Sequence, residues 1–213
     1  MLIYEYKIPI AYRKEFVAKV KKVASNLKMN PNWLMALMDF ESAGTFSPSI
    51  TNSLGYVGLI QFGKAAATDL GTTTQQLRQM SAIQQLDYVE KYFKLWYKRL
   101  KIDKPNGYID TYLIVLFPSA VNKGDDFVIQ AQGISPQKFA INNPAFDKDG
   151  NQIVKVRDVK EVMLKRLPSE WINDGDFKLF VKAYKTPITV LIGLGIVAVT
   201  GLAYYGYGKL NRK

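Results

Sequence analysis

Apolar residues in the N-terminal part of the chain recur with the period of an α-helix. Between residues 13 and 28, the apolar positions that share one face of such a helix are Phe16, Val17, Val20, Val23, Ala24 and Leu27. Most basic residues of this stretch fall on the opposite face, which predicts an amphipathic helix with one buried side. We interpret its basic face as solvated; contact with anionic lipid or glycan is the alternative.

A second helix is predicted to begin at Asn30 and Pro31. Asparagine is a preferred N-cap, and proline is favoured at the first helical position because its missing N–H has no intrahelical partner there. The helix is expected over residues 32–42 and ends near Gly44. A polar loop then continues to about Gly58.

Further helices are expected over residues 63–70, 74–80, 81–101, 109–116 and 154–166. The longest has an apolar seam from Ile83 to Leu100. The helix over 109–116 stops before Pro118, because the residue that precedes a proline is disfavoured in the helical conformation. No helix is assigned to residues 134–150, which carry several turn-forming residues. The predicted fold class is mainly α.

The C-terminal part contains an uncharged stretch of 23 residues, 186–208. About 20 apolar residues suffice to cross a bilayer core, so we predict a single transmembrane helix there, followed by a basic tail, residues 209–213. A buried core helix is the alternative, but the glycines in this stretch are more typical of membrane helices. The start of the chain lacks the pattern of a secretory signal, so residues 1–180 are expected to form one domain tethered by the span.

The amino-acid composition limits the kinds of catalytic group that the chain can use. Histidine and cysteine are both absent, which excludes catalytic triads, thiol nucleophiles and ordinary zinc sites. Any catalytic proton must be carried by a carboxylate, a lysine or a tyrosine. The formal net charge of +11 suggests an anionic partner: nucleic acid, anionic lipid or an acidic cell-wall polymer.

Glu41 is the carboxylate that lies out of place. Leu34, Leu37 and Met38 precede it by seven, four and three residues, so Glu41 lies on the apolar stripe of its helix. Desolvation raises the pKa of a carboxyl, as a general acid requires near neutral pH. The alternative is a glutamate that reaches solvent or pairs with a lysine. Asp39 faces elsewhere on the helix, and we interpret it, like Asp69, as structural.

Two segments together resemble the motifs of a known family. Glu41-Ser42, a polar loop and then Gly58-Leu59-Ile60-Gln61-Phe62 resemble the motif pair of lytic transglycosylases with the lysozyme-like, goose-type SLT domain. Pro31, Trp33 and Leu34 upstream and Phe46-Ser47-Pro48 downstream also resemble this family, and the likeness covers roughly residues 25–120. The resemblance implies an SLT-type helical fold for the domain.

The resemblance also implies a reaction and a set of roles. Glu41 would be the sole acid and base in cleaving the β-1,4 bond between N-acetylmuramic acid and N-acetylglucosamine, with closure of a 1,6-anhydro ring. No second carboxylate, metal or other cofactor is then needed, unlike in two-carboxylate glycosidases. Ser42 would help orient Glu41 or a sugar substituent. Gly58 would allow the backbone to approach the glycan closely, and Gln61 would supply an amide for hydrogen bonding.

The sequence departs from the family at its third motif, Ala-Tyr-Asn. The nearest stretch here is Asp110-Thr111-Tyr112-Leu113, which lacks the asparagine but offers Tyr112 for the hydroxyl beside the glutamate. This departure resembles phage-encoded variants. Phe62 is predicted to be a core residue rather than a sugar platform. Residues 146–151 echo a calcium loop, but terminal ligands are missing, and a tight turn is the better interpretation.

Two classes of function remain. The first is a lytic transglycosylase whose expected partners are peptidoglycan glycan strands, a lipid bilayer and other virion proteins. The second is a non-catalytic lysozyme-like module that binds glycan or organises a membrane. No nucleic-acid recognition motif is found, so no nucleic-acid partner is expected. The order of domain and anchor fits a protein of an internal virion membrane; the bacterial inner membrane is the alternative.

Overall fold

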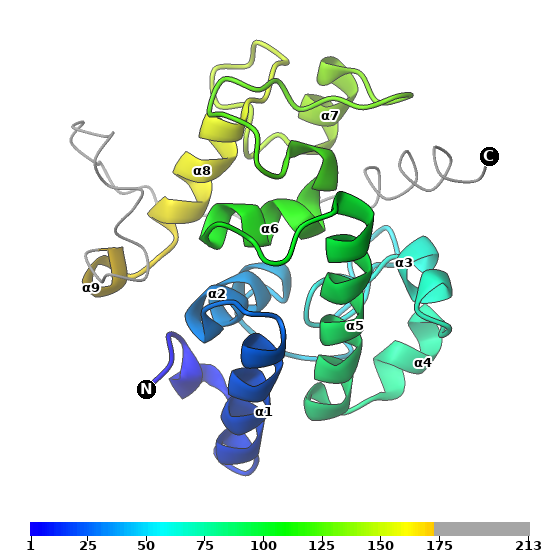
Figure 1. Ribbon diagram of the computed structural model, residues 1–213, viewed down its shortest axis with the longest axis vertical. Coiled ribbons are helices and arrows are strands. Elements are labelled where there is room, and N and C mark those ends of the chain that lie inside the picture. Colours follow the sequence, from blue (N-terminus) through cyan, green and yellow to red (C-terminus); the bar gives the residue numbers. More distant parts are fainter. Residues whose placement is uncertain (173–213) are drawn as a thin grey trace.

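The computed structural model describes residues 1–172, which are mainly helical (Figure 1). Among the described residues no β-strand forms, and only isolated β-bridges occur. The elements in chain order are η1 (Glu5–Lys7), α1 (Arg13–Asn26), α2 (Pro31–Glu41), α3 (Lys64–Asp69), α4 (Thr74–Gln79), α5 (Ala82–Leu100), α6 (Tyr108–Leu116), η2 (Pro118–Ala120), α7 (Pro136–Asn142), α8 (Val156–Lys165) and α9 (Ser169–Ile172).

Helix α1 confirms the amphipathic pattern. Phe16, Val20, Val23 and Ala24 are fully buried, and the helix packs against both α2 and α5. The side chain of Lys19 pairs with Asp87 of α5 at the edge of this contact.

Helix α2 lies between α1 and α6, so it is buried on nearly all sides (Figure 1). The predicted start is confirmed: the Asn30 side chain accepts a hydrogen bond of 2.8 Å from the backbone N–H of Asn32, and Pro31 occupies the first turn. A helix that is apolar on most sides is stable only as a central element. Its last residue, Glu41, is thereby brought into the interior.

The long helix α5 packs against α1 through its buried face. Ser81 and Gln84 form a capping box at its start, in which each side chain bonds the backbone N–H of the other residue. Its buried seam includes Leu86, Val89 and Trp96, as the apolar spacing predicts.

The segment after α6 folds back over that helix. Helix α8 contacts α6, and the ring of Phe139 on α7 packs edge-on against Phe117 with centroids 5.2 Å apart. Helix α7 lies within residues 134–150, to which the sequence pattern assigned no helix. It begins at a Ser135 N-cap followed by Pro136, but its seven residues are too few to show an apolar period.

The acidic loop at residues 146–151 is the predicted turn. The Asp147 carboxylate accepts hydrogen bonds from the backbone N–H of Gln152, and the Asp149 carboxylate accepts one from the Asn151 amide. Gly150 takes a positive φ of 68°, which a tight turn requires. These carboxylates are therefore engaged in local hydrogen bonds.

The predicted membrane span at 186–208 and the basic tail at 209–213 lie outside the described residues, as do residues 173–180 of the predicted domain. None of the helices in residues 1–172 is both long and apolar enough to span a membrane.

Candidate active site

Glu41 lies at the C-terminal end of α2 with its carboxyl group in the interior. Only 6% of the residue is exposed, and neither carboxyl oxygen has a hydrogen-bond partner among residues 1–172. Burial therefore raises the pKa of Glu41 well above its usual value, because nothing nearby offsets the cost of desolvating the charge. Burial therefore favours the protonated, neutral form of Glu41, which can donate a proton.

Tyr112, on α6, shares this buried region. Its hydroxyl is buried without a hydrogen-bond partner among the described residues. Its ring packs edge-on against Phe40, with centroids 5.1 Å apart, and against Phe146, at 6.3 Å. Burial and then the charge of Glu41 raise the pKa of Tyr112, so the two groups interact electrostatically. The structure thus brings together two of the predicted site residues.

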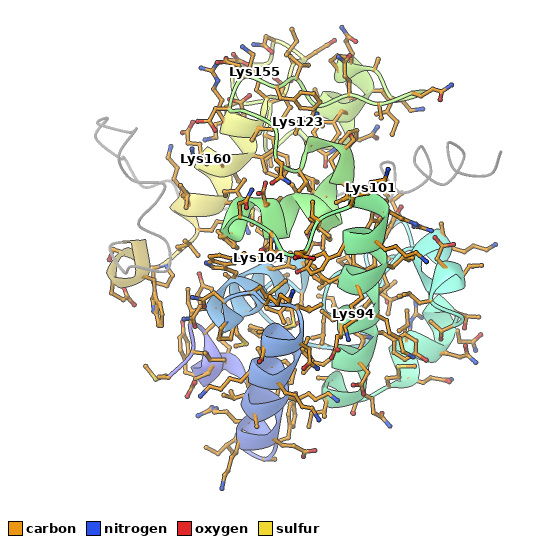
Figure 2. The ribbon with its side chains drawn as sticks, viewed as in Figure 1. Lys94, Lys101, Lys104, Lys123, Lys155 and Lys160 are labelled. Atoms are coloured by element: carbon orange, nitrogen blue, oxygen red, sulfur yellow. The ribbon has the colours of Figure 1, made fainter. Side chains whose placement is uncertain are left out.

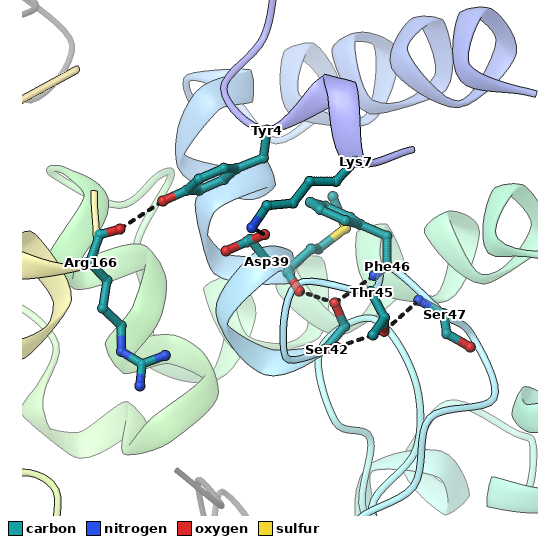
Figure 3. Close-up of polar contacts among 9 residues, drawn as sticks. Tyr4, Lys7, Asp39, Ser42, Thr45, Phe46, Ser47 and Arg166 are labelled. Carbon is teal, nitrogen blue, oxygen red and sulfur yellow. Dashed lines mark hydrogen bonds and ion pairs between the residues drawn. The ribbon is translucent and has the colours of Figure 1, made fainter. Parts of the chain in front are cut away.

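Ser42 terminates α2 immediately after Glu41. Its hydroxyl donates to the backbone carbonyl of Met38 at 2.6 Å and accepts from the backbone N–H of Phe46 at 2.9 Å (Figure 3). The carbonyl of Ser42 in turn accepts from the Thr45 hydroxyl at 2.7 Å. Ser42 is fully buried, and the hydrogen bonds of its hydroxyl hold the end of α2, which carries Glu41, against the following loop.

Gly58 and Gln61 form one tight turn in the loop between α2 and α3. Gly58 takes a φ of 81°, and its N–H donates to the carbonyl of Ile50 at 2.8 Å. Gln61 is 6% exposed, and its side-chain amide donates to the Gly58 carbonyl at 3.1 Å. Val57 forms isolated bridges with Thr51 and Phe62, which fold the loop back on itself. The second motif is therefore a compact structural unit.

Phe62, which closes this motif, is a core residue as predicted. It is 1% exposed, and its ring packs edge-on against Tyr92 of α5 with centroids 6.1 Å apart. The contact anchors the loop to the long helix.

Gln85 of α5 is a residue that sequence reasoning missed. Its fully buried side chain accepts from the N–H of Leu59 at 2.7 Å and donates to the carbonyls of Pro48 and Leu77, each at 3.0 Å. One amide thereby joins the loop, the end of α4 and α5. Gln85 stands beside Leu86 on the buried seam, so a polar residue on an apolar stripe was the available signal.

Asp39 faces away from Glu41, as the helical spacing predicts. Its Oδ1 accepts from the Lys7 ammonium at 2.6 Å, and Lys7 also lies over the Tyr4 ring, 4.4 Å from its centroid (Figure 3). Burial raises the pKa of Asp39, an effect that Lys7 opposes. Asp39 therefore belongs to a separate polar cluster.

Comparisons with family models, curated proteins and solved structures found no match to this chain. The class that the described residues define is a mainly helical domain with an unpaired, buried carboxyl group next to a buried tyrosine.

Proposed function

We propose that this protein is a peptidoglycan lytic transglycosylase with a lysozyme-like fold and Glu41 as its only acid and base. The observation that carries the proposal is the Glu41 carboxyl, buried at the end of α2 without a hydrogen-bond partner among residues 1–172. A purely structural glutamate would be expected to pair with a lysine or an amide, since an unpaired buried carboxyl destabilises the fold. Such groups cluster at functional sites.

The reaction needs two proton transfers at one group. Glu41 first donates its proton to the glycosidic oxygen, and the bond from that oxygen to C1 of the muramyl ring breaks to give an oxocarbenium-like centre. The resulting carboxylate then accepts the proton of the muramyl 6-hydroxyl, and the oxygen of that hydroxyl forms a bond to C1. Glu41 ends protonated, water is not consumed, and the products are a free 4-hydroxyl and a 1,6-anhydro ring.

Burial suits this chemistry in two ways. It favours the neutral acid before cleavage, and it excludes the water that would otherwise compete with the 6-hydroxyl. The carboxyl oxygens lie beneath the surface, so the glycan must displace side chains that cover them. Tyr112 is the nearby hydroxyl suited to donate a hydrogen bond to the carboxylate formed between the two steps.

The positive net charge of the protein supports binding to an anionic partner. Figure 2 labels six lysines that are distributed over α5, α8 and the loops on either side of α6: Lys94, Lys101, Lys104, Lys123, Lys155 and Lys160. Three of them form ion pairs: Lys94 with Glu90, Lys155 with Asp126 and Lys160 with Asp125. Lys101 and Lys104 have no carboxylate within 4 Å in the described part of the chain. We propose that the protein is anchored in a membrane, that of a virion or, alternatively, the bacterial inner membrane, and acts on the cell wall from there. Its partners would be peptidoglycan, lipid and other virion proteins.

Product analysis tests the proposal directly. The full chain, in a non-ionic detergent, is incubated with purified peptidoglycan, and the released muropeptides are identified by mass spectrometry. We expect products with 1,6-anhydro ends, one water lighter than hydrolysis products. Products with reducing ends would show hydrolysis instead. Binding to the wall without any release would favour the non-catalytic module.

The hydroxyl of Tyr112 gives a second, milder test. Tyr112→Phe removes a buried hydroxyl that has no described partner, so we expect unchanged stability or a gain of about 1 kcal/mol in the free energy of unfolding. The same variant should lower the rate of glycan cleavage about tenfold, if the hydroxyl stabilises the carboxylate intermediate. Denaturant unfolding and initial rates measure the two effects.

Tyr97→Phe is the matched control for this pair of measurements. The Tyr97 hydroxyl donates to the carbonyl of Leu27 at 3.1 Å, so its removal should destabilise the fold by about 1 kcal/mol and leave the rate unchanged. A large loss of stability in Tyr112→Phe would show that its hydroxyl has a structural partner, and an unchanged rate would exclude the catalytic role.

A further inference from the structure

A cavity lies beside α2, on the side of the helix that carries Asp39. Its volume is about 240 Å³, comparable to the space of about eight water molecules in the liquid. Such a cavity suits one or two amino-acid residues rather than a glycan strand. Phe40, Tyr108 and Leu167 contribute apolar walls, and Lys7, Asp39 and Arg166 contribute the charges.

Of the two cations that line this cavity, one is paired with a carboxylate of the described residues and the other is not. Lys7 is held by Asp39 at 2.6 Å, but no carboxylate lies within 4 Å of the Arg166 guanidinium among residues 1–172. Arg166 stacks over the Phe40 ring, 4.5 Å from its centroid, and donates no hydrogen bond to a described residue. A planar guanidinium with its donors unused is suited to bind a carboxylate through two parallel hydrogen bonds.

Asp39 supplies the complementary group. Its Oδ1 accepts from Lys7, and its Oδ2 has no hydrogen-bond donor among the described residues. This oxygen can accept from an amide N–H. An acceptor and a guanidinium on one apolar-walled cavity match the last residue of a peptide, which has an amide N–H, a small side chain and a carboxylate.

The position of Arg166 is fixed from two sides. Figure 3 shows the Tyr4 hydroxyl donating to the backbone carbonyl of Arg166, at 2.8 Å, which joins the N-terminal segment to the end of α8. Stacking on Phe40 orients the side chain. The cavity is thus assembled from four separate parts of the chain: the N-terminal segment, α2, α6 and the end of α8.

The cavity also adjoins the proposed active site. Phe40 lines it and packs against Tyr112, and Tyr108 lies one helical turn before Tyr112 on α6. We propose that this cavity binds the terminal carboxylate of a peptidoglycan stem peptide, with Arg166 as the carboxylate ligand and Asp39 as the amide acceptor. The identity of the peptide rests on the proposed function, since peptidoglycan bears short peptides on its muramyl residues.

Direct binding of a peptide end tests the proposal. The probe is N-acetyl-D-alanyl-D-alanine, titrated into the full chain in detergent and followed by calorimetry. We expect saturable binding of the free acid and at least about tenfold weaker binding of its C-terminal amide, because charge-assisted hydrogen bonds to Arg166 are lost. The L,L acid and inorganic phosphate are titrated in parallel.

Variants assign the binding to the cavity. Arg166→Gln should weaken binding of the D,D acid at least about tenfold, whereas Arg78→Gln, the same change at an exposed position on α4, should leave it unaltered. On peptidoglycan, Arg166→Gln should raise KM for peptide-bearing strands and leave KM unchanged for strands stripped of peptides.

Four outcomes would overturn the proposal: equal binding of acid and amide, unchanged affinity in Arg166→Gln, preference for the L,L peptide, or preference for phosphate. Peptide binding is measured without glycan cleavage. Failure of the transglycosylase proposal would therefore leave the binding result intact, and failure of peptide binding would leave anhydro products unaffected.

Discussion

Replacing Glu41 with glutamine will abolish glycan cleavage, lowering the rate by at least about a hundredfold. Glutamine has the size and shape of the neutral acid, so the packing at the end of α2 should be preserved. Its amide can neither protonate the glycosidic oxygen nor accept the proton of the 6-hydroxyl. Release of anhydro-muropeptides from purified peptidoglycan, followed by mass spectrometry, measures the loss.

The same substitution should stabilise the fold in a pH-dependent manner. The usual pKa of a glutamate is 4.5, and burial raises the pKa of Glu41 well above it in the folded state. Between these two values the unfolded chain binds fewer protons than the folded chain, so the stability of the wild type falls as pH rises. Glutamine does not titrate. The excess melting temperature of Glu41→Gln should grow from about pH 4.5 up to the folded pKa and then level off.

Glu15→Gln is the matched control for both readouts. Glu15 is exposed on α1, so this change should leave the rate and the pH dependence of stability close to those of the wild type. A Glu41→Gln variant that still released anhydro products would exclude Glu41 as the acid. If it melted at the wild-type temperature at every pH, the carboxyl would not be desolvated.

The sequence allowed prediction of the parts of the fold that are specified locally. Helices α1 and α5 follow from apolar periodicity, and Asn30 with Pro31 marks the start of α2. Glu41 was found because a carboxyl on an apolar stripe conflicts with the pattern around it. Such conflicts between local rules are expected where a residue serves function rather than stability.

The remainder depends on contacts between distant parts of the chain. Gln85 and Leu59 are 26 positions apart, and Tyr4 and Arg166 are 162 positions apart, so no local pattern joins them. Phe146 reaches Tyr112 only because the segment after α6 folds back on that helix. The cavity beside Arg166 and the hydrogen bonds by which Gln85 holds the loop at Gly58 are thus products of tertiary packing.

Gln85→Leu should destabilise the domain by roughly 3 kcal/mol. The substitution leaves three backbone groups without the partner they have now: the buried N–H of Leu59, the buried carbonyl of Leu77 and the part-buried carbonyl of Pro48. Each lost hydrogen bond costs about 1 kcal/mol. We also expect glycan cleavage to fall below detection, because the turn that holds Gly58 and Gln61 is released. Gln75→Leu, at an exposed position of α4, is the control and should alter neither property.

A double-mutant cycle of Gly58→Ala and Gln85→Ala separates the direct effect of Gln85 on the turn at Gly58 from a general loss of packing. A Cβ at position 58 would lie 2.2 Å from the Gln85 Oε1, and the φ of 81° adds strain of its own. In the Gln85→Ala background the collision is removed while the strain stays, so Gly58→Ala should cost at least about 1 kcal/mol less there than in the wild type. Additive effects on the free energy of unfolding would show that Gln85 does not set the position of the turn. Coupling together with a matching loss of cleavage would identify Gln85 as the positioning residue of the second motif.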